Sequence, residues 1–173
     1  MLIESAHLNG VKLIKPCSFE DHRGEYLQLY NEEDYKSSIP EIRDVNFVEE
    51  DISTATKYVI KGLHGDLKTW KLISCLHGKF YLIVANPKNY TWESFVLSDV
   101  NKYQVLIPPG LGNGHMCMSE KSIYHYKQSE YYNLDRQFTI RWNDKKYKFW
   151  WPVKTPILSQ RDETGDKSYV LGK

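Results

Sequence analysis

The sequence predicts an all-β domain, built as a sandwich or a closed barrel. Short apolar runs rich in β-branched and aromatic residues recur along the chain, and clusters of Gly, Pro, Asn and Asp separate them. Aromatic residues, which favour strands, make up 14% of the 173 residues. Helical periodicity is scarce. A chain of this length can bury a full core without disulfide or metal staples, so we expect one domain over residues 1–173.

Six strands are expected between residues 71 and 144, because each of these segments is apolar and ends at a turn signal. Gly78 divides the first two segments in a hairpin-like arrangement. The six segments span residues 71–77, 79–87, 94–98, 103–109, 122–132 and 137–144.

Two other regions do not have the strand pattern. Residues 31–42, NEEDYKSSIPEI, predict a short helix ended by Pro40, since proline cannot continue a helix. The tail from about residue 152 has no clear periodicity, and we expect it to be irregular.

Charge and composition exclude several classes of protein. Lys and Arg total 23 and Asp and Glu total 22, so the net charge of +1 argues against a nucleic-acid-binding protein. Cys17, Cys75 and Cys117 lie far apart without a CxxC motif, which favours reduced thiols in the cytoplasm. We expect no signal peptide, because the first ten residues lack its pattern. No apolar run approaches about 18 residues, so we expect no membrane span.

Metal, nucleotide-loop and hydrolase chemistries lack their sequence markers. The six histidines form no HxH, HxxH or HExxH motif. IPPGLGNGH is similar to the second metal motif of cupin barrels, but Asn113 replaces its histidine, and KGLHGD offers a single histidine. No GxSxG, GxxxxGK[ST] or GxGxxG is present. We therefore expect no metal site.

Acid–base catalysis remains, and the chain supplies the residue types that it needs. A histidine such as His64 can act as a base, a tyrosine such as Tyr126 as an acid, and a carboxylate such as Asp162 can orient the imidazole. Lys71 can stabilise an enolate oxygen. From spacing alone each residue also has a purely structural explanation: a loop histidine, a packed tyrosine, a turn-capping aspartate and a solvated lysine.

Period-two geometry divides the side chains of segment 122–132 into two sets on opposite faces, and one set must face the interior. The two sets are Tyr124, Tyr126 and Gln128, and His125, Lys127 and Ser129.

Several motifs in order resemble the dTDP-4-dehydrorhamnose 3,5-epimerase family over nearly the whole chain. The motifs are FEDHRG (19–24), KGLH (61–64), KLI (71–73), PPGLGNGH (108–115), YKQSEYY (126–132), WND (142–144), WP (151–152) and LSQRD (158–162). The resemblance implies a double-stranded β-helix, a jelly-roll of the cupin type, with few short helices and without metal or cofactor. It also implies a homodimer in which an N-terminal strand joins the partner's sheet.

The resemblance further implies a reaction on a nucleotide-diphospho-4-keto-6-deoxy sugar. A base removes the proton at C3 or C5, beside the ketone, and an acid returns one to the opposite face. By motif position, His64 is the base, Tyr126 the acid, Asp162 the partner of His64, and Lys71 the group that holds the enolate oxygen. Further residues are expected to bind the diphosphate (Arg23, Lys61) and to line the nucleotide end (Phe19, Tyr26, Tyr132).

Several departures from the family pattern surround the expected sugar and phosphate positions. Lys61 replaces an arginine, Asn113 replaces a histidine that is found two places later as His115, and Glu49 and Glu50 occupy a usual Q-x-N segment. We therefore expect Glu49, Asn113 and His115 to contribute to substrate binding. The combination is most similar to a branch that acts on GDP-linked 4-keto-6-deoxy-heptoses for capsule assembly, inverting C3 alone or C3 and C5.

Three alternatives stay open. The first is the dTDP-4-dehydrorhamnose 3,5-epimerase itself, and the second is a 3,4-ketoisomerase, which shifts the carbonyl instead of inverting carbon. The third is a catalytically silent nucleotide-sugar-binding barrel. Pocket shape decides among related sugars, and the sequence does not determine that shape.

Overall fold

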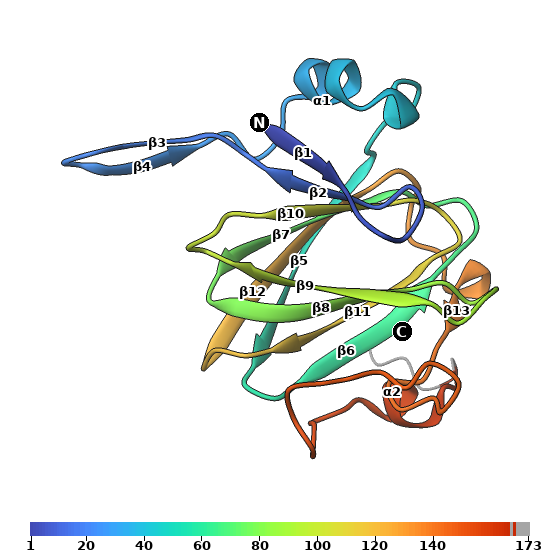
Figure 1. Cartoon of the computed structure of the whole chain (residues 1–173). Helices are drawn as coiled ribbons and strands as arrows, with labels where there is room; N and C mark the ends of the chain where they lie inside the picture. Colours follow the sequence, from blue (N-terminus) through green and yellow to red (C-terminus); the bar gives the residue numbers. More distant parts are fainter. Residues whose placement is uncertain (167, 169–173) are drawn as a thin grey trace.

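Two antiparallel sheets face each other in the computed structural model, which describes residues 1–166 and residue 168 (Figure 1). The first sheet has six strands in the order β1 (Leu2–Ser5), β2 (Lys12–Lys15), β10 (Gln104–Ile107), β7 (Lys71–His77), β12 (Lys121–Gln128) and β5 (Glu49–Thr56). The second has five, in the order β13 (Phe138–Thr139), β6 (Ile60–Gly65), β11 (Gly112–Cys117), β8 (Lys79–Ala85) and β9 (Trp92–Ser98). The predicted all-β fold is confirmed.

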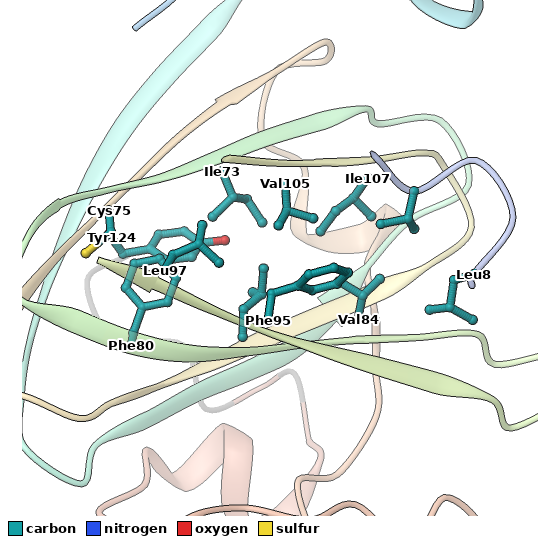
Figure 2. Packing of buried hydrophobic residues seen from close by; sticks show 12 residues of the cluster. Leu8, Ile73, Cys75, Phe80, Val84, Phe95, Leu97, Val105, Ile107 and Tyr124 are labelled. Atoms are coloured by element: carbon teal, nitrogen blue, oxygen red, sulfur yellow. The ribbon is translucent and has the colours of Figure 1, made fainter. Parts of the chain in front are cut away.

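The core lies between the two sheets, where alternate side chains of facing strands meet (Figure 2). Ile73 and Val105 come from the first sheet, and Phe80, Leu82 and Leu97 from the second; all five are fully buried. Burying a side chain of this size stabilises the fold by about 1.5–3 kcal/mol. These residues belong to the apolar runs that predicted the strands.

The outer face of the six-stranded sheet is covered by α1 (Glu32–Ser38) and the 3-10 helix η1 (Pro40–Ile42). Asn31 caps α1, since its side chain accepts hydrogen bonds from the backbone N–H groups of Glu33 and Asp34. Tyr35 and Ile39 pack against Leu72 of β7. The helix predicted over 31–42 is confirmed; it ends at Ser38, before Pro40.

The C-terminal segment covers the outer face of the five-stranded sheet. Tyr147 and Trp151 are buried against Tyr81, Ile83 and other residues of this sheet. The expectation of an irregular tail is wrong in one respect, because it contains the short helix α2 (Gln160–Thr164) beside β6. Another 3-10 helix, η2 (Leu134–Arg136), precedes β13.

The hairpin-like pairing expected around Gly78 is also wrong. β7 pairs with β10 and β12, whereas β8 pairs with β9 and β11, so the chain crosses from one sheet to the other at Gly78. Gly78 has a φ of +72°, and a Cβ there would collide with the backbone oxygen of Lys121. A crossover this tight therefore requires glycine.

The boundaries of two other expected strands differ from the prediction. β12 ends at Gln128, and the segment 137–144 forms only the two-residue strand β13. The first sheet ends at β1, which pairs with β2 of the same chain. β3 (Ser18–Asp21) and β4 (Gly24–Leu27) form a separate hairpin that extends from the body of the molecule (Figure 1). In the described part of the chain, no helix has the length and hydrophobicity to cross a membrane.

Candidate active site

A cavity of about 200 Å³ lies between the two sheets and brings together most of the predicted site residues. The five-stranded sheet contributes residues from β6 and β11, and the six-stranded sheet contributes residues from β5, β7 and β12. The predicted residues that line it are Lys61, His64, Lys71, Asn113, His115, Tyr126 and Tyr132.

His64 lies against Asp162, which is buried behind it. Nε2 of His64 is 2.8 Å from Oδ1 of Asp162, although the ring N–H is poorly aligned for a hydrogen bond in this conformation. Burial lowers the pKa of His64, and the charges of Arg161 and Lys71 lower it further, which outweighs the opposite effect of Asp162. The imidazole is therefore neutral near pH 7 and able to accept a proton.

Helix α2 positions the Asp162 carboxylate. Ser159 caps the helix by accepting a hydrogen bond from the backbone N–H of Asp162 at 3.1 Å, and its hydroxyl donates to Oδ2 of Asp162 at 2.8 Å. Burial raises the pKa of Asp162, but its contacts with His64, Ser159 and the Gly62 N–H outweigh this effect, so the pKa is lowered. The carboxylate is thus ionised beside the histidine.

Lys71 reaches the cavity from the first residue of β7. Its Nζ donates to Oδ1 of Asn113 at 3.2 Å, and Nδ2 of Asn113 donates to the Tyr124 hydroxyl at 3.1 Å. Burial lowers the pKa of Lys71 to about 8, while the charge of Asp66 raises it and that of Arg161 lowers it further. Lys71 is therefore a cation at neutral pH that loses its proton at mildly alkaline pH.

Lys61 and His115 also line the cavity. Nζ of Lys61 donates to Oγ of Ser53 at 2.7 Å and to the backbone oxygen of Thr54 at 2.8 Å. His115 stacks on Tyr124, with ring centroids 4.1 Å apart. Burial lowers the pKa of His115 to about 3, so this imidazole is neutral. Neither residue has a carboxylate within ion-pair distance in the part of the chain that the structure describes.

β12 turns one of its two predicted faces toward the cavity. Tyr124, Tyr126 and Gln128 line the cavity. His125 and Lys127 lie on the other face, where both contact Glu50, at 2.6 and 2.7 Å. Tyr126 therefore points into the same space as His64, from the opposite sheet.

Glu49 is the first residue of β5 and lies directly opposite Gln128, the last residue of β12. Its carboxylate accepts hydrogen bonds from Nε2 of Gln128 at 2.6 Å and from the backbone N–H of Tyr132 at 3.0 Å. The side chain thus fixes the segment that carries Tyr132, which lines the cavity.

Glu49 does not itself line the cavity, and three further predicted binding residues lie away from the cavity of their own chain. Phe19, Arg23 and Tyr26 lie on the β3–β4 hairpin (Figure 1). Phe19 is 70% exposed and Tyr26 63%, and Arg23 is paired with Asp21 at 2.6 Å. The hairpin leads away from the two sheets of its own chain, so the role of these residues in the site stays a prediction.

Sequence reasoning missed several residues of the site. Arg161 is buried, lines the cavity and donates to Oε1 of Gln137 at 3.0 Å. Asp51, on β5, lies directly opposite Tyr126 in the strand pairing, and the two side chains shift each other's pKa. The only sequence signals for these two residues were their neighbours in the chain. Arg161 directly precedes Asp162 in LSQRD, and Asp51 follows Glu49 and Glu50.

The described residues contain no group of three or more His, Cys, Asp or Glu side chains arranged to hold a metal ion. All three cysteines are unpaired; Cys75 and Cys117 are buried and Cys17 is exposed. The polar groups of the cavity are instead suited to moving protons and to binding an anion.

Comparisons with known proteins identify the family. The family model for dTDP-4-dehydrorhamnose 3,5-epimerase matches residues 5–168. An enzyme of that name from Shigella flexneri is 30% identical over 175 residues, covering 96% of each chain.

Comparison with solved structures leads to the same family. A dTDP-6-deoxy-D-glucose-3,5-epimerase from Legionella pneumophila, in complex with dTDP-4-keto-L-rhamnose, has a TM-score of 0.87 and 27% identity, covering 93% of this chain and 89% of its own. A dTDP-4-dehydrorhamnose 3,5-epimerase from Bacillus anthracis, with TDP and PPi bound, has a TM-score of 0.85 and 30% identity, covering 94% and 97%. With its two-sheet barrel and the His64–Asp162 pair, the chain belongs to the dTDP-4-dehydrorhamnose 3,5-epimerase family.

Proposed function

We propose that the protein is an isomerase that inverts C3 and C5 of a nucleotide-diphospho-4-keto-6-deoxy sugar. One observation carries the proposal: His64 with Asp162 faces Tyr126 across a single cavity, and Lys71 lies in the same cavity. His64 comes from the five-stranded sheet and Tyr126 from the six-stranded sheet. A sugar ring between them has a base on one face and an acid on the other.

The proton transfers follow from this arrangement. The 4-ketone acidifies the C–H bonds at C3 and C5, and neutral His64 removes one of these protons. The electron pair of the broken C–H bond moves to the ketone oxygen, giving an enolate that the Lys71 cation stabilises. The Tyr126 hydroxyl then protonates the carbon from the opposite face. Asp162 stabilises the imidazolium that forms, as a carboxylate behind a catalytic histidine does.

Basic side chains support the diphosphate as the anionic part of the substrate. Arg161 and Lys61 both line the cavity and have no carboxylate partner within ion-pair distance among the described residues. A guanidinium binds phosphate oxygens through paired N–H donors, whereas the lysine contributes a point charge. We therefore propose that Arg161 and Lys61 contribute to binding the diphosphate.

The comparisons favour a dTDP-linked hexose over the GDP-linked heptose that the departures from the family pattern indicate. The relatives described above are named for dTDP-linked sugars. We therefore propose dTDP-4-dehydrorhamnose chemistry as the principal activity. The GDP-linked heptose, and a place in capsule assembly, find no support among these relatives.

Proton NMR in D₂O tests the proposal, with the dTDP-linked 4-keto-6-deoxy-hexose as substrate and its C3–H and C5–H signals as the readout. We expect both signals to disappear and the product to show inverted C3 and C5. His64→Asn should abolish exchange and inversion, with a loss of about 10²–10⁴-fold in rate. The GDP-linked heptose serves as the second substrate.

Each other outcome contradicts part of the proposal. Loss of the C3 signal alone would make the enzyme a 3-epimerase, and movement of the ketone would make it a 3,4-ketoisomerase. Faster exchange with the GDP-linked heptose would overturn the choice of nucleotide sugar. Binding of both nucleotide sugars without exchange would overturn the enzyme and leave a silent binding protein.

A further inference from the structure

Asp51 and Tyr126 form a cross-strand pair on the cavity side of the six-stranded sheet. In the antiparallel register of β5 and β12, Tyr126 is directly opposite Asp51, with Tyr124 opposite Ser53 and Gln128 opposite Glu49. Side chains of directly opposed residues lie on the same face, with Cβ atoms about 4.5–5.5 Å apart. The Tyr126 hydroxyl and the Asp51 carboxyl are close enough for each to shift the pKa of the other. The proposed proton donor therefore has a carboxylate partner of its own.

A second carboxylate adjoins this pair. Glu49 lies two residues before Asp51 on the same face of β5, and its charge acts on the Asp51 carboxyl. A neighbouring negative charge disfavours ionisation of a carboxyl group, so the Asp51 carboxyl keeps its proton to a higher pH than an isolated one. Burial raises the pKa of Asp51, and the charge of Glu49 raises it further. Both residues are only half-buried, so solvent reaches this proton.

Glu49 is held in place at one end of this series of side chains, and the cavity lies at the other end. Its two carboxylate oxygens accept hydrogen bonds from Gln128 and from the Tyr132 backbone, so it is held at the end of the strand pair. Asp51 then lies between Glu49 and Tyr126 along β5 and β12. The series of polar side chains on this face runs from Glu49 through Asp51 to Tyr126, and ends at the cavity that Tyr126 lines.

We propose that Asp51 is a positioning residue for Tyr126, which orients the phenol toward the substrate and passes a proton back to it after each inversion. The inference rests on the proposed epimerase activity. Once Tyr126 has given its proton to carbon, it is a phenolate, while His64 carries the proton taken from the substrate. Asp51 in its protonated form transfers its proton to the phenolate oxygen and regains one from solvent. His64 releases its proton to solvent, so the protons balance.

The test separates proton abstraction from inversion in Asp51→Asn. Deuterium entry at C3 and C5 in D₂O reports abstraction by His64, and the appearance of inverted product reports delivery by Tyr126. We expect the ratio of exchange to inversion to rise about tenfold, while the exchange rate itself changes less than about threefold. Impaired delivery from Tyr126 lets the enolate be reprotonated from the His64 side. A purely structural role would lower both rates together.

Glu50→Gln is the matched control, because it removes one carboxylate from the same strand on the opposite face, where Glu50 contacts His125 and Lys127. The ratio should stay at the wild-type value in this variant. Asp51→Ser is the second variant if Asp51→Asn does not fold, and melting temperatures establish which variants are folded. An unchanged ratio in a folded Asp51 variant overturns the inference. Absence of exchange in the wild-type protein overturns the proposed function instead.

Discussion

Two ionisable side chains in one cavity have opposite requirements. His64 must be neutral to accept a proton, whereas Lys71 must be charged to stabilise an enolate. Burial lowers both pKa values: that of His64 falls below its usual 6.5 and that of Lys71 falls to about 8. A pH interval therefore exists in which the histidine is neutral and the lysine is a cation. The interval includes neutral pH.

The pH dependence of kcat/KM follows from these two groups. We expect it to rise as His64 loses its proton, at a pH below 6.5, and to fall near pH 8 as Lys71 loses its own. Lys71→Arg keeps a cation at all these pH values, so the fall near pH 8 should disappear while the rise at low pH stays. The measurement is kcat/KM from pH 5 to 10 for both proteins.

Lys71→Met serves as the uncharged control. It should lose about 10²–10³-fold in kcat, the usual cost of removing one group that stabilises a developing oxyanion. An alkaline limb near pH 8 that persists in Lys71→Arg would assign that limb to another group.

The sequence predicted individual site residues unevenly. His64, Lys71 and Tyr126 could be placed from ordered motifs, and the structure brings them into one cavity. Asp51 and Arg161 were missed, because their contacts are made across strands or from a short helix. No local pattern in the sequence encodes such a contact. The two-residue alternation of side chains separated the two faces of β12. Which face lies inside depends on the packing of the opposite sheet, which that alternation does not reveal.

Among the secondary-structure elements, the short helix α2 affects both the stability of the fold and the geometry of the active site. Ser159 both caps the helix and donates to the carboxylate that lies against His64. Ser159→Ala should cost about 0.5–2 kcal/mol in the free energy of unfolding, the usual cost of losing such a cap. We expect kcat to fall as well, because the Ser159 hydroxyl makes both of its contacts with Asp162, and the variant loses them together.

Differential scanning calorimetry and kcat measured well below the melting temperature distinguish the two effects. Ser159→Thr keeps a hydroxyl and is the control, for which we expect values close to those of the wild-type protein. A stability loss in Ser159→Ala with unchanged kcat would show that Ser159 stabilises the helix without assisting Asp162.

Strands that pack in the core were predicted well, whereas three of the five strands that build the cavity, β5, β6 and β11, were not. β7 and β8 consist largely of buried apolar residues, so their pattern is plain in the sequence. β5 reads EEDISTAT and β11 reads GNGHMC, with polar side chains or glycines at positions that face the cavity. The residues that make a site polar are therefore those that interrupt the strand signal. The crossover at Gly78 was missed because a hairpin and a sheet-to-sheet crossover share the same turn signal.

For the molecule as a whole, the exposed position of the β3–β4 hairpin has no explanation within a single chain. It exposes Phe19 and Tyr26 on a two-stranded ribbon away from the core. An isolated two-stranded ribbon is at best marginally stable in water. The resemblance to the family implies a homodimer, and a dimer would give these side chains a surface to cover. We therefore predict that Arg23, on this hairpin, acts in the cavity of a partner subunit.

Complementation between two inactive variants tests this prediction. Arg23→Ala keeps its own His64 and lacks the hairpin cation, whereas His64→Asn keeps Arg23 and lacks the base. If the hairpin crosses to the partner, each mixed dimer has one complete site, in which the Arg23→Ala chain supplies His64 and the His64→Asn chain supplies Arg23. Equal amounts of the two variants, unfolded and refolded together, should then recover about a quarter of the wild-type activity, since about half of the dimers are mixed and each has one working site. Refolding each variant alone gives the baseline. Activity equal to the average of the two baselines would show that Arg23 does not act across a dimer.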